Sequence, residues 1–405
     1  MDKKHRRDFL KKSILGISAA AIAPGVVKAS TVFDAPLLQD AIPDLPSRIL
    51  GRTGLKTPLI SLGAGGAYDP NFVKAAYYAG IKFFFSATYY GEGNNEKMVG
   101  EGLKGLSRDS FVVGTAVLAD GFDNRNGVFT TPLDVNAYIK KADASLARFG
   151  LDYVDILLFP FAGKKETVQH PPMLEAMRKL KEQGKTRFAG IAAHSDCAEA
   201  LRSAADCGVY DVAMVAYNFK EPNPGSMNEA LSYATKAGMG VVAMKTTAGV
   251  YRDKSKSNPL NSDALLKWVL QNKDITSIVS GMSTLEQLQK NLAMVKNPEL
   301  TDQEKKDLSL ASLGPEPGLY CHQCRKCVPQ CIHNLEIPTA MRSYMYAYGY
   351  RNMEHAKYTL AEAGITGKPC ENCDSCNVKC TAGFDIRERM LDISRLAEVP
   401  SEFLV

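Results

Sequence analysis

Short apolar runs alternate with helical patterns through residues 59–300 of this chain. Runs such as Val-Ala-Met-Val-Ala at 212–216 are typical of strands that are buried on both faces of a parallel sheet. Between such runs, apolar residues recur at helical spacing, as Ala142, Leu146 and Phe149 do. The pattern predicts strands at residues 59–63, 83–86, 111–117, 154–158, 187–191, 212–216, 240–244 and 275–280, with helices that include 94–106, 135–149, 172–183 and 228–237.

Eight strands that are each followed by a helix predict an α/β fold, the (β/α)8 TIM barrel. A doubly wound open sheet is the alternative, but no G-x-G-x-x-G follows the first predicted strand. Ahead of the barrel, residues 49–55 predict a short hairpin that turns on Gly51 and Gly54.

The composition divides the chain into four parts. We expect a signal peptide at 1–29, a proline-bearing linker at 30–47, the barrel at 48–300 and a small domain at 315–395. Helical spacing at 341–363 predicts that the small domain is mainly helical.

Two copies of one cysteine pattern, C-x2-C-x2-C-x3-C, fall in the small domain. A [4Fe–4S] cluster needs four thiolates, and in two-cluster ferredoxins the fourth cysteine of each run ligates the other cluster. The sequence therefore predicts a ferredoxin-like domain with two [4Fe–4S] clusters, one held by Cys321, Cys324, Cys327 and Cys380 and the other by Cys370, Cys373, Cys376 and Cys331.

Other chemistry fits these cysteines less well. Zinc sites usually use pairs of C-x2-C without a third cysteine in the run. Closely spaced triplets cannot all form disulfides with normal geometry. The two remaining cysteines, Cys197 and Cys207, fall on a predicted helix, where we expect them to be packing residues.

The N-terminus has the features of a twin-arginine (Tat) export signal. Arg6 and Arg7 precede an uncharged stretch from Ser13 to Val27, whose fifteen residues are too few to span a bilayer. A small-residue cleavage site ends at Ala29, and an uncleaved anchor is the alternative. Because this pathway carries folded proteins, we expect clusters to be loaded before export to the periplasm or the outer face of the cytoplasmic membrane.

The charge distribution excludes one class of partner. Residues 1–29 hold seven Lys/Arg and two Asp, which accounts for the formal net charge of +5, so the rest of the chain is close to neutral. No basic footprint for nucleic acid remains. We expect instead a small-molecule substrate, a redox partner or membrane electron donor, and the twin-arginine export machinery.

Several segments of the barrel resemble those of aldo-keto reductases. Residues 80–91 resemble their second strand and the loop after it, 153–159 the fourth strand, 185–191 the fifth and Tyr217-Asn218 the end of the sixth. Residues 280–291 resemble the phosphate-binding turn and helix of the nicotinamide site. A subgroup of that family carries a C-terminal ferredoxin module, so the barrel and the cysteine-containing domain both resemble that subgroup.

The resemblance implies a catalytic set that is only partly present. The family reduces carbonyls with a tyrosine acid, which matches Tyr90, tuned by a lysine–aspartate pair and assisted by a histidine. The aspartate, lysine and histidine positions fall on Phe85, Ala116 and Phe159. Losing the lysine and the aspartate together avoids a buried unpaired charge. We therefore expect an apolar pocket in which Tyr90 is the proton donor.

His194 is a second catalytic candidate. It follows the fifth strand at the barrel mouth, and the ordinary pKa of histidine suits acid–base chemistry. A cap on the next helix or a hydrogen bond to a loop is the alternative.

The resemblance also implies NADP(H) as a cofactor. Its ring would stack on Tyr217, and its phosphate would meet the turn and helix that contain Gly281, Gln287 and Asn291. For Tyr217 the alternative is a half-buried strand-end tyrosine without a cofactor role. Lys245 ends the seventh predicted strand and would pair with a phosphate or a substrate carboxylate, and a solvated strand-end lysine is the alternative. The positions that hold the carboxamide in the family are apolar here, namely Ala192, Ala193 and Met214. Nicotinamide binding therefore stays open.

The leading hypothesis is an exported iron–sulfur oxidoreductase of aldo-keto reductase type. It would pass electrons between the clusters and a substrate or nicotinamide at the barrel mouth. The alternative is a non-catalytic electron-transfer or small-molecule-binding protein on a reductase-derived barrel. A third hypothesis is a cytoplasmic enzyme whose N-terminus only mimics an export signal.

Overall fold

The computed structural model describes residues 42–249, 261–313, 318–371, 373 and 375–404. The predicted export signal at 1–29 and most of the predicted linker lie outside these residues. The described residues belong to one compact unit, Ile42–Val405. No helix within the described ranges is both long and apolar enough to cross a membrane.

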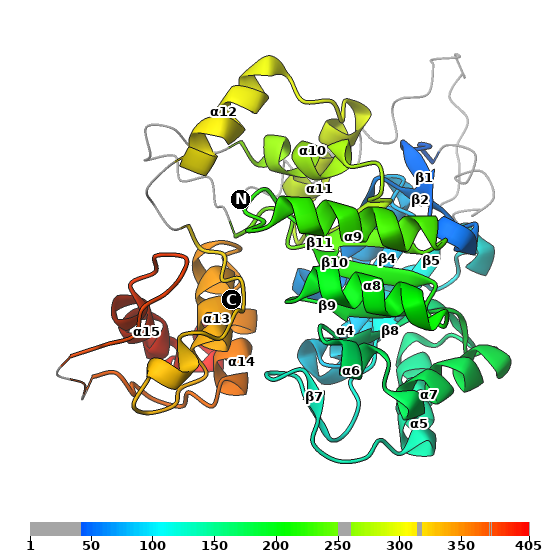
Figure 1. Ribbon diagram of the computed structural model, residues 1–405. Helices are drawn as coiled ribbons and strands as arrows, with labels where there is room; N and C mark the ends of the chain where they lie inside the picture. The colour runs from blue at the N-terminus through cyan, green and yellow to red at the C-terminus, as the bar shows by residue number, and fades with distance from the viewer. Residues whose placement is uncertain (1–41, 250–260, 314–317, 372, 374, 405) are drawn as a thin grey trace, which may run out of the picture. The chain divides into compact units, whose positions relative to one another are not determined.

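Eight parallel strands close into a barrel, which confirms the predicted fold class (Figure 1). The circle is completed where the last strand pairs with the first, with Ile278 opposite Ile60. Each strand agrees with a predicted one to within two residues. In order around the barrel they are β3 (Ile60–Gly63), β4 (Phe83–Ala87), β5 (Val112–Ala116), β8 (Val154–Pro160), β9 (Thr186–Ala193), β10 (Val212–Ala216), β11 (Gly240–Met244) and β12 (Ser277–Gly281).

Helices follow the strands and surround the barrel. The predicted helix at 228–237 begins earlier, at Pro224, because Asn223 caps it by accepting a hydrogen bond from the Ser226 amide and proline suits the first turn. The surrounding helices are α3 (Pro70–Tyr78), α4 (Asn94–Leu103), α5 (Val135–Phe149), α7 (Pro171–Glu182), α8 (Cys197–Cys207), α9 (Pro224–Lys236), α10 (Ser262–Gln271) and α11 (Leu285–Lys296).

Smaller elements complete the barrel. A hairpin of β6 (Phe122–Asp123) and β7 (Val128–Phe129) follows β5, and the short α6 (Lys165–Val168) follows β8. Helix α12 (Asp302–Leu313) follows α11.

The predicted hairpin ahead of the barrel is formed by β1 (Ser47–Ile49) and β2 (Lys56–Pro58). Its turn places Leu50 among the side chains that fill the barrel interior. Gly51 has a φ of +49°, and a Cβ there would lie 2.3 Å from the backbone nitrogen of Gly240. Only glycine allows this close approach, by which the hairpin closes the amino-terminal end of the barrel.

The C-terminal module is mainly helical, as predicted. Helices α13 (Ile337–Tyr348), α14 (Met353–Glu362) and α15 (Ile386–Ser394) pack around their own buried core, which includes Met341, Leu360 and Met390. The single helical pattern predicted at 341–363 is divided, because α13 ends before Gly349 and Asn352 caps α14 through the His355 amide.

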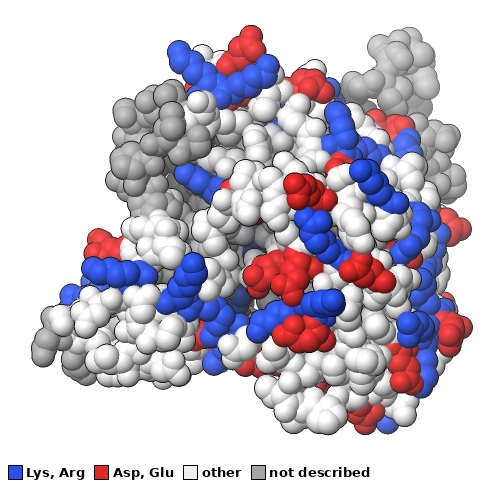
Figure 2. All heavy atoms as spheres, in the orientation of Figure 1, with Lys and Arg blue, Asp and Glu red and all other residues white. Residues whose placement is uncertain are grey.

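Figure 2 shows one face of the molecule, on which acidic and basic side chains are interspersed. The basic residues on this face are not gathered into a single patch. This agrees with the near-neutral charge of the chain beyond residue 29.

A buried carboxylate joins β5 to two of the outer helices. Glu96 of α4 accepts hydrogen bonds from Thr115 (2.6 Å) and Ser145 (2.5 Å), and pairs with Arg148 of α5 at 2.6 Å. The carboxylate is fully buried, whereas the Arg148 side chain is 23% exposed. Its hydrogen bonds therefore offset the cost of burying the charge.

We expect Glu96→Ala to lower the free energy of unfolding by about 3 kcal/mol, because it leaves Arg148 without its partner. Denaturant unfolding followed by circular dichroism measures the change. Asp44→Ala is the control, since it breaks an exposed pair with Lys56 and should cost less than about 1 kcal/mol. Equal losses in the two variants would contradict this account.

Candidate functional site

The barrel interior is apolar at two of the three positions to which the resemblance assigns the aspartate, lysine and histidine of the catalytic set. Phe85 of β4 and Ala116 of β5 lie together in the cluster of side chains that fills the barrel. Gly114 lies beside them, and a Cβ there would come within 3.0 Å of the Phe85 ring. The ring therefore fills space that a side chain at position 114 would compete for.

The structure does not place Phe159 with these two residues. Ile156 and Leu158 of β8 face the barrel interior. Because side chains alternate along a strand, Phe159 faces outward, toward the helices. Phe159 packs in the outer layer against Phe122 and Phe129 of the β6–β7 hairpin, with ring centroids 4.9 and 5.7 Å away. The expectation that Phe159 contributes to the apolar pocket is therefore wrong, because a shift of one residue reverses the face.

Four cysteines of the module surround a common space. Cys321, Cys324, Cys327 and Cys380 line a hollow of about 310 Å³, part of it open to solvent. Cys380 is the fourth cysteine of the second run, yet it lies with the first three cysteines of the first run. This is the predicted crosswise arrangement, in which the fourth cysteine of each run joins the other run. The Thr381 hydroxyl lies 3.5 Å from the Cys324 sulfur, and the Ala382 amide donates to the Cys380 sulfur at 3.4 Å.

The other four cysteines form a second group. The pKa of Cys370 is raised to about 11, first by burial and then by the neighbouring thiols of Cys373, Cys331 and Cys376. Burial likewise raises the pKa of Cys321 to about 12, with Cys327, Cys380 and Cys324 as its thiol neighbours. Both groups therefore have the membership expected for crosswise ligation.

These residues fit iron–sulfur clusters better than a single ion. Thiolates without a cation would be costly at these positions, and a metal centre offsets that cost. Zinc draws its ligands to about 2.3 Å from one point. Within the described residues, no three His, Cys, Asp or Glu side chains converge in that way. Cys321, Cys324, Cys327 and Cys380 instead line the hollow described above, which suits a cubane.

Each cysteine group lies near an arginine of α15. Arg389 interacts electrostatically with Cys380 and Cys321, and its guanidinium lies 3.9 Å above the Phe384 ring. Arg387 donates to the Cys373 carbonyl at 3.0 Å. Both cations favour negatively charged ligands near them.

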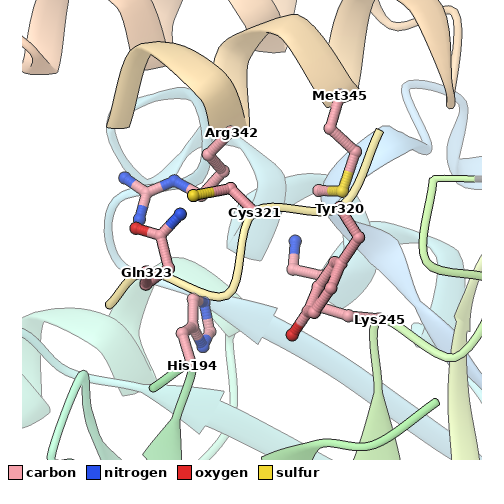
Figure 3. Close-up of a pocket in the computed structure, with 7 residues that line it drawn as sticks. All are labelled: His194, Lys245, Tyr320, Cys321, Gln323, Arg342 and Met345. Atoms are coloured by element: carbon pink, nitrogen blue, oxygen red, sulfur yellow. The ribbon is translucent and has the colours of Figure 1, made fainter. Parts of the chain in front are cut away.

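A second cavity, of about 280 Å³ including the part that is open to solvent, lies between the barrel mouth and the module (Figure 3). His194 and Lys245 reach it from the ends of β9 and β11. Arg342 and Met345 reach it from α13, and the segment from Tyr320 to Gln323 crosses between them. Cys321, a predicted cluster ligand, is part of the wall. The cavity therefore borders both the mouth of the barrel and one cysteine group.

Lys245 makes the central contact between the two halves. Its ammonium donates to the hydroxyl of Tyr346 on α13 at 2.5 Å and lies 4.4 Å from the centre of that ring. The backbone of Lys245 is left-handed, with a φ of +56°. Such strain at a residue other than glycine is concentrated at functional positions.

His194 lies in this cavity and does not cap the following helix, which begins after Asp196. Its Nδ1 is buried without a hydrogen-bond partner, and its ring meets the edge of Phe161 at 5.0 Å. Burial lowers the pKa of His194 well below its usual value, and the charges of Lys245 and Arg342 lower it further. At neutral pH the imidazole is therefore uncharged.

Tyr90 lies beside the module. Its ring centroid is 6.0 Å from that of His355 on α14. Burial raises the pKa of Tyr90 above its ordinary value, and Arg342 of α13 acts in the opposite direction. A cation of the module therefore acts on the Tyr90 hydroxyl. A catalytic role for Tyr90 stays a prediction.

The predicted nicotinamide residues lie in three separate places. Gln287 accepts a hydrogen bond from the Ser283 amide at 2.8 Å, and Asn291 donates to the Ser280 hydroxyl at 3.1 Å, so both organise the turn that contains Gly281. Tyr217 instead packs its ring on Trp268, 5.1 Å away between centroids. Lys245 belongs to the cavity and not to this turn. Stacking by Tyr217 stays a prediction.

The ends of the strands differ in how well they fit a nicotinamide. Ala192 and Met214 are buried in the barrel interior and offer no side-chain hydrogen bonds for a carboxamide. The turn at Gly281 precedes the amino end of α11, where backbone N–H groups favour a phosphate. The phosphate end therefore fits, whereas the ring end lacks the polar contacts of the family.

The sequence did not predict which residues of the C-terminal module line the cavity. Arg342, Met345 and Tyr346 lie on the predicted helical pattern, but their direction depends on how α13 rests on the barrel. Tyr320 and Gln323 adjoin the first cysteine run, and no spacing rule assigns them a role. The tyrosine-rich composition of this helix was the one available sign of an aromatic contact surface.

Comparison with known proteins identifies the barrel. The sequence profile of the Aldo/keto reductase family matches residues 67–265. The L-galactose dehydrogenase of Arabidopsis thaliana is 30% identical over 313 residues, covering 67% of this chain and 94% of that protein. The chain belongs to the aldo-keto reductase family.

A second sequence profile, that of a 4Fe-4S dicluster domain, matches residues 320–385. This aldo-keto reductase therefore carries an iron–sulfur domain. A further relative is the NADH-specific methylglyoxal reductase of Escherichia coli K12, 26% identical over 313 residues, which cover 62% of this chain and 92% of that protein.

Solved structures of the family share the fold. An aldo-keto reductase from Bacillus halodurans in its holo form has a TM-score of 0.54 at 21% identity, covering 66% of this chain and 96% of its own. An aldo-keto reductase from Klebsiella pneumoniae in complex with NADPH has a TM-score of 0.52 at 22% identity, with coverages of 67% and 96%. In each case the match is close to the size of the barrel alone.

Crosswise ligation can be tested by removing the fourth cysteine of each group. We expect Cys380→Ala and Cys331→Ala each to lower the iron content by about half, and to remove different electron-paramagnetic signals. Cys197→Ala is the control, because that cysteine lies outside both groups and should leave iron unchanged. Loss of the same signal in both variants would contradict the grouping.

Two buried histidines predict how stability depends on pH. Burial lowers the pKa of His355 to about 3 and also lowers that of His194. Below about pH 6.5 the unfolded chain binds protons that the folded protein does not, so the free energy of unfolding falls by up to about 1.4 kcal/mol per pH unit for each histidine. His355→Gln should reduce this slope between about pH 6.5 and 5, measured by denaturant unfolding.

The matched control is His333→Gln, which changes an exposed histidine. A slope in His355→Gln equal to that of the unaltered protein would show that His355 does not contribute.

Proposed function

We propose that this protein is an exported iron–sulfur oxidoreductase that passes electrons between two [4Fe–4S] clusters and a small molecule bound at the barrel mouth. The observation that supports this proposal is the cavity shared by the mouth and the module. His194 and Lys245 belong to the barrel side, and Cys321 belongs to the cysteine group on the other side. A molecule in this cavity would lie next to a cluster ligand.

The division of roles follows from the residues. The four thiols around the hollow would hold one cluster, which when bound supplies one-electron transfer, and the Cys370 group would hold the other. The cavity side chains would bind and orient the substrate. Tyr320 and Met345 would exclude water from it, since both present apolar surface.

Two tyrosines are placed to handle a proton. Tyr346 receives a hydrogen bond from the Lys245 ammonium, which would stabilise the negative charge left when its hydroxyl proton departs. The resemblance assigns Tyr90 the role of the family's tyrosine acid, and Arg342 is the nearby cation that favours its ionised form. Uncharged His194 could accept a proton or donate one at a ring nitrogen.

Electrons need not come from a nicotinamide. Ala192 and Met214 offer no polar contacts for the carboxamide of a nicotinamide ring. Clusters held by the two cysteine groups would instead accept electrons from a redox partner or membrane donor. An export signal at residues 1–29 would place the protein where NADP(H) is not normally supplied. This combination favours a partner-fed enzyme.

The proposal is tested on the full, cluster-loaded protein, purified without oxygen. We expect dithionite to reduce the clusters, and a carbonyl compound from a panel of aldehydes and 2-oxo acids to reoxidise them with product formation, followed by absorbance. NADPH is added in a separate arm. NADPH binding with cluster reduction would make the nicotinamide the electron donor. No reoxidation by the panel, together with no NADPH binding, would favour the non-catalytic alternative.

Two matched variants locate the proton donor. Tyr346→Phe and Tyr90→Phe are compared. Whichever of the two removes the proton donor should slow reoxidation of the clusters by roughly 10²- to 10⁴-fold. Tyr233→Phe changes an exposed tyrosine of α9 and serves as the control. Unchanged rates in both test variants would exclude these tyrosines from the reaction.

A further inference from the structure

The charges around the mouth cavity are unbalanced. Lys245 and Arg342 both line it, whereas no aspartate or glutamate does. Within the described ranges Lys245 has the Tyr346 hydroxyl as its hydrogen-bond partner and forms no ion pair. A partly buried ammonium without a counter-ion attracts a negative charge, so the site suits an anion.

Arg342 is only partly neutralised. Its partner Glu362 lies 3.5 Å away, on α14, and is not part of the cavity wall. A guanidinium has five N–H donors, so one long ion pair leaves donors for a further acceptor. The Arg342 side chain is 12% exposed, which keeps these donors in a site of low polarity.

A third polar atom points to a ligand. The Nδ1 of His194 is buried without a partner, in the same cavity. Buried polar atoms are normally hydrogen-bonded, and an orphan in a cavity lined by two cations indicates a missing polar group. In Figure 3 the side chains of His194, Lys245 and Arg342 come from different elements to one space.

We propose that this cavity binds the carboxylate of a small organic acid, held by Lys245 and Arg342 and oriented by His194. Guanidinium and carboxylate groups match in geometry, and the apolar surfaces of Tyr320 and Met345 suit the carbon chain more than they suit an inorganic ion. The proposal rests on the proposed function in one respect, since it identifies the substrate class at the mouth next to Cys321.

Charge compensation is the competing explanation for the same cations. Lys245 and Arg342 could serve only to balance the thiolates of the Cys321 group. In that case an added carboxylate would have no preference over a neutral molecule of the same shape. The test therefore compares propionate with propionamide, which differ in charge and not in size.

The measurement is calorimetric titration of the cluster-loaded full protein with each probe. We expect propionate to bind at least about tenfold more tightly than propionamide and than inorganic phosphate. Lys245→Met and Arg342→Met should each weaken propionate binding by roughly 10- to 150-fold, as for a lost hydrogen bond to a charged group. Lys104→Met, at an exposed lysine of the barrel surface, should leave binding unchanged.

Several results would overturn the proposal: no propionate binding, equal binding of propionate and propionamide, a preference for phosphate, or unchanged binding in both folded variants. Iron content and denaturant unfolding show whether the variants fold, and the comparison of probes needs no variant. Propionate carries no reducible carbonyl group, so its binding is independent of electron transfer. Binding without reoxidation by any substrate would reject the proposed function alone, and reoxidation without carboxylate binding would reject the site alone.

Discussion

The candidate site depends on the hydrogen bond between Lys245 and Tyr346. An ammonium at the end of a barrel strand needs an acceptor once α13 covers it, and the phenol oxygen supplies one. Next to this contact the backbones of Gly249 and Gly349 come together so closely that a Cβ on Gly349 would lie 2.3 Å from the Gly249 carbonyl oxygen. Two positions without side chains thus let α13 rest on the mouth, which places Cys321 in the cavity wall.

The filled barrel interior explains why the proposed ligand site lies beside the Lys245–Tyr346 contact. Phe85 and Ala116, which the resemblance aligns with the family's charged pair, lie in this apolar interior, and Gly114 makes room for the Phe85 ring. A closely packed apolar core cannot hold a polar molecule without opening a cavity. A ligand must therefore bind above the strand ends, at the level where His194 and Lys245 meet the side chains of α13.

The sequence predicted what depends on local pattern. Strands buried on both faces leave continuous apolar runs, and cysteine spacing carries its own geometry, so the barrel and the grouping of Cys380 with Cys321 were both foreseeable. Phe159 was assigned to the wrong face, because alternation along a strand turns a one-residue shift into a reversal. Arg342 and Tyr346 were beyond local reasoning, since they approach Lys245 only when a helix about a hundred residues later packs on the barrel.

The apolar residues at the positions expected to hold a nicotinamide agree with the proposal that a redox partner supplies the electrons. A nicotinamide transfers hydride only while its ring is held against the substrate, which requires polar side chains for its carboxamide. A cluster held by Cys321 at the cavity wall, as proposed, would impose no such requirement, so Ala192 and Met214 could remain apolar. The constraint then falls on α13, which carries the cavity cation Arg342 and packs in the same core as Cys327. In the proposed enzyme, substrate binding and electron entry would both depend on this packed helix, so a change that shifts α13 would affect both together.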